Sequence, residues 1–183
     1  LDVGAQDGFN SDNFFAAKYN KFFDNILVEP IKKEAEKLTS KKGVITKGLW
    51  SKKDKKKLYI LGNRSGSSSM YRPNNKNFDL HNIKDKNYKN YEVTSTIEIE
   101  CDTLNNLLSE FKIKNIDYLK VDTQGAELEI LNGIGNYRPL LIKIEAHIFS
   151  MYNDVPSWHK LLNKLYDLNY VLIDWKDIGE HNS

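Results

Sequence analysis

The chain has 183 residues, of which 40% are hydrophobic, and its 27 Lys and Arg residues against 25 Asp and Glu leave a formal net charge of +2. That length and hydrophobic content suffice to bury one core, so we expect a single domain over residues 1–183, and the small net charge gives no field that would attract nucleic acid or an anionic membrane. The single cysteine, Cys101, excludes an internal disulfide, and the sequence has no apolar stretch of the ~18 residues that span a membrane, so we expect a cytoplasmic protein with a small-molecule partner.

Short apolar runs typical of buried strands return throughout the chain. They occupy residues 1–3, 25–28, 43–46, 116–121, 140–144 and 170–173. Apolar residues with helical spacing lie between them, at 15–22, 31–38, 104–111 and 158–168, and we expect the first of these helices to begin near Ser11. This alternation of strands and helices predicts an α/β domain with a doubly wound, mostly parallel sheet.

Residues 50–100 interrupt the alternation. The lysine-rich run at 52–57 predicts a polar hairpin turn with a solvated surface, and we assign it no function. Residues 62–78 are rich in Gly, Ser and Asn without a period, which is typical of a long loop that is either a lid or a mobile insertion. Alternating β-branched residues at 91–101 predict a further strand. We therefore expect an insertion-like loop and hairpin region within the one domain.

The opening stretch, LDVGAQDG, places two glycines directly after the first expected strand. Open α/β sheets bind ligands at the carboxyl ends of their strands, where Gly4 and Gly8 would let the backbone approach a ligand closely. Glu29 closes the second expected strand, where a carboxylate can accept hydrogen bonds from both hydroxyls of a ribose. The glycine spacing is wrong for a dinucleotide site, whereas Asp2, the two glycines and Glu29 fit the pattern of an S-adenosylmethionine site. Alternatively, the glycines form a plain tight turn and Glu29 only begins a helix.

The segment IDYLKVDTQGAELEILNG, at residues 116–133, carries the most specific motif. An apolar strand ends in Asp122, a turn containing Gly125 follows, and a helix directs Leu128 and Leu131 inward. This block resembles the signature of the FkbM-type S-adenosylmethionine-dependent methyltransferases. Other segments resemble that family in the same order along the chain: LDVGAQDG, LVEP, VITKGLWS, SGSSSM, CDTLNNLL and LLIKIEAH. The resemblance spans nearly the whole chain, although both termini look trimmed against the family and Gln124 stands where many relatives carry Glu.

The resemblance implies a class I methyltransferase sheet, S-adenosylmethionine as the cofactor, and a hydroxyl of a sugar, glycan or secondary metabolite as the methyl acceptor. It also implies a set of cofactor-binding residues. These are Asp2, Gly4 and Gly8 at the methionine end, Glu29 at the ribose, Trp50 near the adenine, Ser67 and Ser68 from the 62–78 loop, and Asp122 at the end of its strand. Alternatively, Trp50 belongs to the core and the serines to a loop without a ligand.

Methyl transfer to a hydroxyl needs alignment of the oxygen with the methyl group and a base that takes the proton. The candidate catalytic residues are Asp122, Glu127 and His147, and Glu145 follows the same strand as His147. Each has a structural alternative: Asp122 caps the following helix, Glu127 interacts with the positive helix end, and His147 is a buried structural histidine. Because no spacing of His or acidic residues indicates a metal cage, we expect no tightly bound metal.

Two functions of other classes stay open from the sequence alone. The domain could bind the cofactor without catalysis, as a regulatory or assembly module, or it could be an NAD-dependent enzyme. The sequence does not indicate an oligomeric state.

Overall fold

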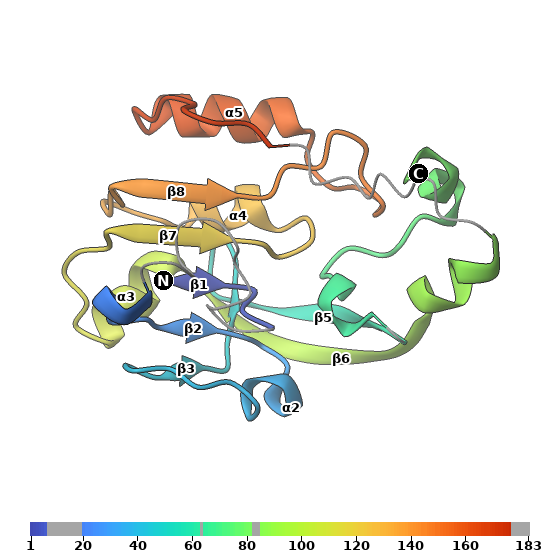
Figure 1. The fold of residues 1–183 in the computed structure, drawn as a ribbon, viewed down its shortest axis with the longest axis horizontal. Coiled ribbons are helices and arrows are strands. Elements are labelled where there is room, and N and C mark those ends of the chain that lie inside the picture. The colour runs from blue at the N-terminus through green and yellow to red at the C-terminus, as the bar shows by residue number, and fades with distance from the viewer. Residues whose placement is uncertain (7–19, 63, 82–84, 177–183) are drawn as a thin grey trace.

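The computed structural model describes residues 1–6, 20–62, 64–81 and 85–176, which form two β-sheets flanked by helices (Figure 1). The larger sheet has five parallel strands in the order β3-β2-β1-β7-β8. They are β1 (Asp2–Val3), β2 (Leu27–Val28), β3 (Val44–Ile45), β7 (Tyr118–Val121) and β8 (Leu141–Ile144). The chain order reverses between β1 and β7, so their carboxyl ends form the switch point at which such sheets bind ligands. The predicted α/β fold with a mostly parallel sheet is confirmed.

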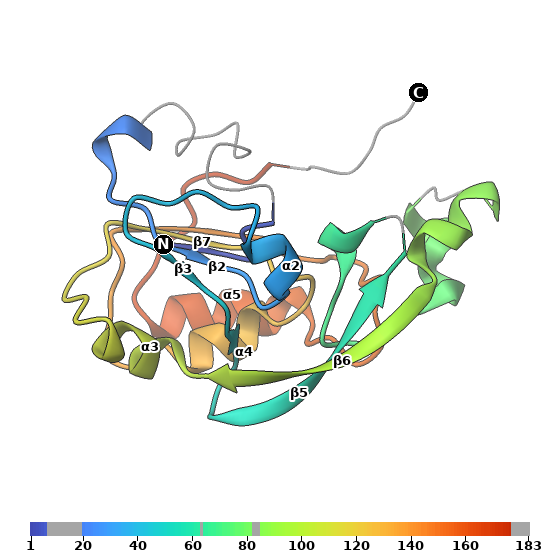
Figure 2. The same ribbon diagram turned by 90° about the horizontal axis from the view of Figure 1, so that it is seen from below.

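Helices cover one face of this sheet. Figure 2 shows α3 (Leu104–Glu110), α4 (Glu127–Asn132) and α5 (Trp158–Asp167) on the same side of the strands. Because side chains alternate along a strand, Val3 and Val121 share a core with these helices, while Leu27 and Tyr118 belong to a smaller apolar cluster. Shorter helical elements are η2 (Asn20–Phe22) and α2 (Lys32–Ala35), which is shorter than the helix predicted at 31–38. The helix predicted to begin near Ser11 lies outside the described residues.

The smaller sheet has three strands in the order β4-β6-β5. They are β4 (Gly48–Leu49), β5 (Asp54–Leu61) and β6 (Val93–Asp102), of which β5 and β6 form a long antiparallel ribbon and β4 runs parallel to β6. The helical turns η3 (Ser65–Ser67), η4 (Asn75–His81) and η5 (Asp85–Tyr91) connect the two strands of the ribbon. The strand predicted at 91–101 is thereby confirmed as β6.

The connection after β5 is hydrogen-bonded to the loop that precedes α5. The backbone N–H of Asn74 donates to the carbonyl of Met151 at 2.7 Å, and that of Asn153 donates to the carbonyl of Arg72 at 2.8 Å. Residues 72–74 and 151–153, which are far apart in the sequence, therefore lie side by side, beyond the end of the ribbon at which β5 ends and β6 begins.

Two predictions of local structure are wrong. The lysine run at 52–57 is not a hairpin turn, because β5 begins at Asp54 and an exposed two-stranded ribbon accommodates lysines along its solvated side; Lys55, for example, pairs with Glu98 across the strands at 3.1 Å. The strand predicted at 170–173 does not form, and Val171 and Ile173 are each at least 75% exposed. A strand needs a hydrogen-bonded neighbour, and the five-stranded sheet ends at β8 in the part of the chain described.

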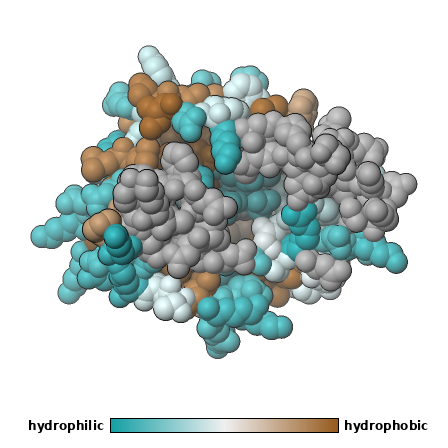
Figure 3. All heavy atoms as spheres, viewed as in Figure 1, coloured by the Kyte–Doolittle hydropathy of each residue, from teal (hydrophilic) through white to brown (hydrophobic). Residues whose placement is uncertain are grey.

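The hydropathy of the surface varies between the edges of the molecule. In Figure 3 hydrophobic residues gather toward the α5 edge of the view, and hydrophilic residues prevail around the ribbon. Exposed apolar side chains include Leu140, Tyr166 and Val171. Among the described helices, none has the length and apolar character needed to cross a membrane.

Candidate functional site

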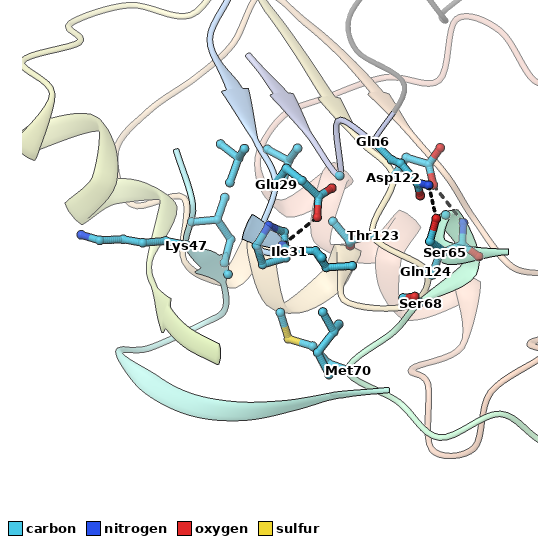
Figure 4. Close-up of a pocket in the computed structure, with 18 residues that line it drawn as sticks. Gln6, Glu29, Ile31, Lys47, Ser65, Ser68, Met70, Asp122, Thr123 and Gln124 are labelled. Carbon is cyan, nitrogen blue, oxygen red and sulfur yellow. Dashed lines mark hydrogen bonds between the residues drawn. The ribbon is translucent and has the colours of Figure 1, made fainter. Parts of the chain in front are cut away.

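A cavity lies at the carboxyl ends of β1, β2 and β7, where the five-stranded sheet meets the ribbon and its loop (Figure 4). The space between its walls is about 560 Å³ when it is counted out to open solvent. Its lining includes Val3, Gly4, Gln6, Val28, Glu29, Pro30, Ile31, Lys47, Gly48, Leu49, Leu58, Ser65, Gly66, Ser68, Met70, Asp122, Thr123 and Gln124. Figure 4 shows Glu29 and Lys47 toward one end and Asp122, Gln124 and Gln6 gathered at the other.

Gly4 joins the ends of the two central strands. Its φ is +78°, and a Cβ built at this position would lie 1.8 Å from the backbone carbonyl oxygen of Asp122. Only glycine fits both the left-handed conformation and this close approach. The predicted glycine turn is therefore part of the cavity floor at Gly4, whereas Gly8 lies outside the described residues.

Glu29 follows β2 and lines the cavity as the sequence predicts. It is only 5% exposed, and its Oε1 accepts a hydrogen bond from the backbone N–H of Ile31 at 2.8 Å. Burial raises the pKa of this carboxyl to about 7. A carboxylate held in this way at a strand end can accept hydrogen bonds from the adjacent hydroxyls of a ribose.

Asp2 does not line the cavity, in contrast to Gly4. The side chain is fully buried, and its Oδ1 accepts a hydrogen bond from Lys120 Nζ at 3.1 Å. Burial raises the pKa of Asp2, and the adjacent Lys120 partly offsets that effect. The structure therefore places Asp2 in a buried ion pair that joins β1 to β7.

The loop after β5 forms the wall opposite the parallel strands. Gln6 Nε2 donates to Ser65 Oγ at 2.5 Å, and a Cβ added to Gly66 would lie 2.6 Å from Gln6 Oε1. Ser68 lines the cavity as predicted, and its hydroxyl accepts from the backbone N–H of Leu61 at 3.3 Å. Ser67 is outside the lining and contributes its carbonyl oxygen to a hydrogen bond with Tyr152. Sequence reasoning missed Gln6, although it lies within the opening glycine stretch.

Trp50 also lies outside the cavity lining. Its ring packs against Tyr71 with 5.9 Å between centroids, and Lys56 Nζ lies 4.6 Å from its ring centroid. The apolar lining near Glu29 comes instead from neighbouring elements: Ile31, Leu49, Leu58 and Met70. Leu49, adjacent in the sequence to the predicted Trp50, is part of this lining.

The polar end of the site consists of side chains from the ends of β7 and β8. Gln124 Nε2 donates to Asp122 Oδ1 at 3.0 Å and to Glu145 Oε2 at 2.8 Å. His147 Nε2 lies 3.2 Å from the same Glu145 oxygen. The structure thus brings together two predicted residues, Asp122 and His147, through Glu145 and through Gln124, which was not predicted to act.

The pKa values of the Glu145 and His147 pair are both raised. Burial raises the pKa of Glu145 to about 7, and the hydrogen bond from His147 opposes this. For His147, burial lowers the pKa, but the hydrogen bond and negative charge of Glu145 outweigh it, so the net shift is upward. A group that titrates near neutral pH is suited to accept a proton during catalysis.

Glu127 is buried beneath the turn between β7 and α4. Its Oε1 accepts three hydrogen bonds, from the backbone N–H and hydroxyl of Thr123 at 2.8 and 3.0 Å and from the N–H of Gly125 at 3.1 Å. The side chain is 4% exposed and is not part of the cavity lining. Its carboxylate therefore holds the turn that carries Asp122 and Gln124.

No group of three or more His, Cys, Asp or Glu side chains within the described residues could hold a metal ion. The site offers instead a buried carboxylate at one end, a backbone floor in the middle and a hydrogen-bonded polar cluster at the other end.

A parallel sheet with a glycine turn and a buried carboxylate at its switch point defines a Rossmann-like α/β domain of the kind that binds nucleoside-containing ligands. Within that class, residues 2–172 match the family model described as the methyltransferase FkbM domain, and the chain belongs to this family of methyltransferases. A search of curated proteins and one of solved structures found no significant match.

Proposed function

We propose that this protein transfers the methyl group of S-adenosylmethionine to a hydroxyl of a sugar, a glycan or a secondary metabolite. The observation that carries the proposal is that one cavity connects Glu29 to Asp122 across the glycine floor at Gly4. An adenosine with an attached amino acid is an elongated ligand with a ribose diol near one end. A cavity with a carboxylate beyond β2 and polar groups beyond β7 matches that distribution of groups.

Each part of the cavity has a role under this proposal. Glu29 accepts hydrogen bonds from the ribose hydroxyls, and Ile31, Leu58 and Met70 provide an apolar environment for the adenine. Because Gly4 has no side chain, the methionine portion can pass close to the backbone between β1 and β7. When bound, S-adenosylmethionine supplies an electrophilic methyl group on a sulfonium.

The polar cluster receives the proton. As the bond between the acceptor oxygen and the methyl carbon forms, the bond from carbon to sulfur breaks and the hydroxyl proton passes to a base of the protein. Asp122, which lines the cavity, is one candidate base, and the hydrogen-bonded pair of Glu145 and His147, which lies outside the lining and is joined to it through Gln124, is the other. Positioning of the hydroxyl and exclusion of water supply the rest of the acceleration.

Ligand-induced stabilisation tests the cofactor assignment. We expect S-adenosylhomocysteine to raise the thermal unfolding midpoint, because a ligand that binds only the folded state stabilises it by mass action, whereas NAD leaves the midpoint unchanged. Stabilisation by NAD alone would contradict the proposal.

A transfer assay tests catalysis. We expect label from S-adenosylmethionine carrying a radioactive methyl group to appear in at least one member of a panel of sugars, glycans and hydroxylated secondary metabolites. Binding of S-adenosylhomocysteine without transfer to any of these acceptors would favour a cofactor-binding module without catalysis.

A further inference from the structure

The side-chain amide of Gln124 occupies the centre of the polar cluster. Its nitrogen lies within hydrogen-bonding distance of carboxylate oxygens from two different strand ends, Asp122 Oδ1 at 3.0 Å and Glu145 Oε2 at 2.8 Å. An amide NH₂ group carries two protons, so it can donate one to each carboxylate. The carboxyl groups of Asp122 and Glu145 also lie within hydrogen-bonding reach of each other, so their ionised forms repel, and the amide donor offsets part of that repulsion.

The amide is held at its oxygen as well. The hydroxyl of Tyr152, which is 2% exposed, lies 3.0 Å from Gln124 Oε1 and 2.6 Å from the carbonyl oxygen of Ser67. The single proton of this hydroxyl is shared between the two acceptors, and its contact with the amide oxygen favours the orientation in which the NH₂ group faces the carboxylates. Tyr152 thereby connects the loop that forms the cavity wall to the amide at the centre of the cluster.

The backbone of Gln124 adopts a conformation that is unfavourable for a residue with a side chain. Its φ is +58°, and Gly125 follows with φ +118°. Such a conformation costs on the order of 1–3 kcal/mol and persists only where its surroundings impose it. Here the surroundings are the three hydrogen bonds to Glu127 Oε1 and a bond of 2.6 Å from Ser69 Oγ to the carbonyl oxygen of Gln124. These four hydrogen bonds, three to Glu127 and one from Ser69, hold the backbone of the turn that carries Gln124.

We propose that Gln124 is a positioning residue, a neutral bridge whose amide donates to the carboxylates of both Asp122 and Glu145 and so favours their ionised forms, which lets Glu145 and His147 accept the proton of the methyl acceptor. This inference rests on the proposed function and deepens it, because it assigns the orientation of the base to a residue that takes no proton itself. Gln124 acts through its neighbours and not on the reacting atoms.

The charges around Glu145 make its pKa sensitive to the hydrogen bond from Gln124. The pKa of Glu145 is raised to about 7, chiefly by burial; the hydrogen bond and charge of His147 oppose this shift, and the charge of Asp122 and a hydrogen bond with it add to the shift. The other titratable groups around the pair are Glu127, at the start of α4, and the hydroxyl of Tyr152. Loss of the amide donor removes stabilisation from the charged form of Glu145, so the carboxyl would take up its proton at higher pH.

The test is the titration of the Glu145 carboxyl followed by carbon-13 NMR, with the resonance identified by its loss in Glu145→Gln. Gln124→Met keeps the length of the side chain and removes the donor, and we expect the Glu145 titration to move upward by at least about 0.5 pH unit. Gln124→Glu places a third carboxylate at the same position, so we expect a larger upward shift.

Two further variants control this measurement. Asn153→Asp adds one negative charge on the exposed surface of the loop that carries Tyr152, and we expect it to move the Glu145 titration by less than about 0.2 pH unit because exposed charges are screened. Tyr152→Phe keeps the ring and removes the hydroxyl, and we expect a smaller upward shift than in Gln124→Met. If either substitution at position 124 prevents folding, the test becomes whether the Glu145 titration moves upward in Tyr152→Phe.

A Glu145 titration in folded Gln124→Met within about 0.2 pH unit of the parent protein would overturn the bridge. So would a shift in Asn153→Asp as large as that in Gln124→Glu, since it would reflect charge in general. The titration needs neither cofactor nor acceptor, so its result is independent of the proposed function. If the titration shifts as expected but no acceptor is methylated, the proposed function fails and the bridge stands.

With a methylated acceptor in hand, the same variants give a kinetic readout. We expect Gln124→Met to lower kcat more than tenfold with little change in the KM for the acceptor, and to move the acidic limb of the kcat profile to higher pH. A lower kcat with an unmoved pH profile would contradict a role in orienting the base.

Discussion

The two ends of the cavity are constructed differently. Around Glu29 the lining is mostly apolar, with Ile31, Leu58 and Met70, and the carboxylate is held by one backbone N–H, while the amine of Lys47 at this end pairs with Glu110. Around Gln124 the side chains are polar and bonded to one another across the ends of β7 and β8. The first end is set by burial of a single charge, and the second by mutual hydrogen bonding. We therefore expect a substitution at Glu29 to change the properties of that residue alone, whereas a substitution in the polar cluster should change the pKa values and positions of several hydrogen-bonded neighbours.

Gly4 lies in the cavity floor between the two ends, and we expect its substitution to lower the stability of the protein more than any other substitution proposed below. In Gly4→Ala the new Cβ would collide with the carbonyl oxygen of Asp122 in a backbone conformation that alanine disfavours. We expect the free energy of unfolding to fall by about 4 kcal/mol, as the sum of backbone strain and overpacking. Denaturant unfolding measures this change. Gly43→Ala is the matched control, because Gly43 also has positive φ but no atom would lie within 4 Å of its Cβ. A loss no greater than in that control would contradict the close approach.

The pH dependence of stability isolates the Glu29 end. Its pKa is raised from 4.5 to about 7 in the folded state, so between these values the folded protein binds more protons than the unfolded chain and its contribution to stability falls as pH rises. Glu29→Gln removes this effect. We expect the variant to gain stability relative to the parent, on the order of 3 kcal/mol, as pH rises from 4.5 to 8. Unfolding measurements at several pH values check this, and a constant difference would contradict it.

Binding provides a separate test of Glu29. Glu29→Gln should weaken the affinity for S-adenosylhomocysteine at pH 8 by about tenfold to a hundredfold, because hydrogen bonds to a charged acceptor contribute roughly 1.5–3 kcal/mol. Calorimetric titration gives the Kd. Glu34→Gln, on the neighbouring helix α2, is the control for loss of a nearby charge. Equal affinity in the parent and Glu29→Gln would exclude the ribose role.

The smallest effect is expected at Trp50. Because its ring packs on Tyr71 outside the cavity lining, Trp50→Phe should change the Kd for S-adenosylhomocysteine by less than about threefold, with a modest loss of stability from reduced packing. The same calorimetric titration checks this. A loss of affinity comparable to that of Glu29→Gln would restore the sequence-based prediction of an adenine contact.

The sequence predicts those parts of the site that follow directly from a strand. Gly4, Glu29 and Asp122 come at or just after the ends of apolar runs, and parallel strands bring such ends to one edge of a sheet. Gln6, Ser65 and Met70 were missed because they line the cavity only when the ribbon folds back over that edge. No periodicity in a single sequence records where a long loop will dock.

Glu127 and Tyr152, in and around the polar cluster, also have contacts that depend on tertiary structure and could not be predicted from the sequence. The motif around Asp122 pointed to Glu127 as a candidate acid, yet the partners of its carboxylate depend on the turn geometry at Thr123 and Gly125. Tyr152 contacts Ser67 and Gln124 from a loop far along the chain, and nothing in its local sequence indicates that contact. The strand predicted at 170–173 failed for a related reason, since its hydrophobicity could not supply a neighbouring strand.

The attachment of the ribbon has a mechanical consequence. At one end, two residues separate β3 from β4, one residue separates β6 from α3, and the N–H of Trp50 donates to the carbonyl of Asp102 at 2.9 Å. At the other end, segment 72–74 is bonded to 151–153. The ribbon is thus attached to the parallel sheet at one end and, through the segment that follows β5, to the loop before α5 at the other. We therefore expect it to move together with the parallel sheet when a ligand binds beside Asp122, and not to open as a lid.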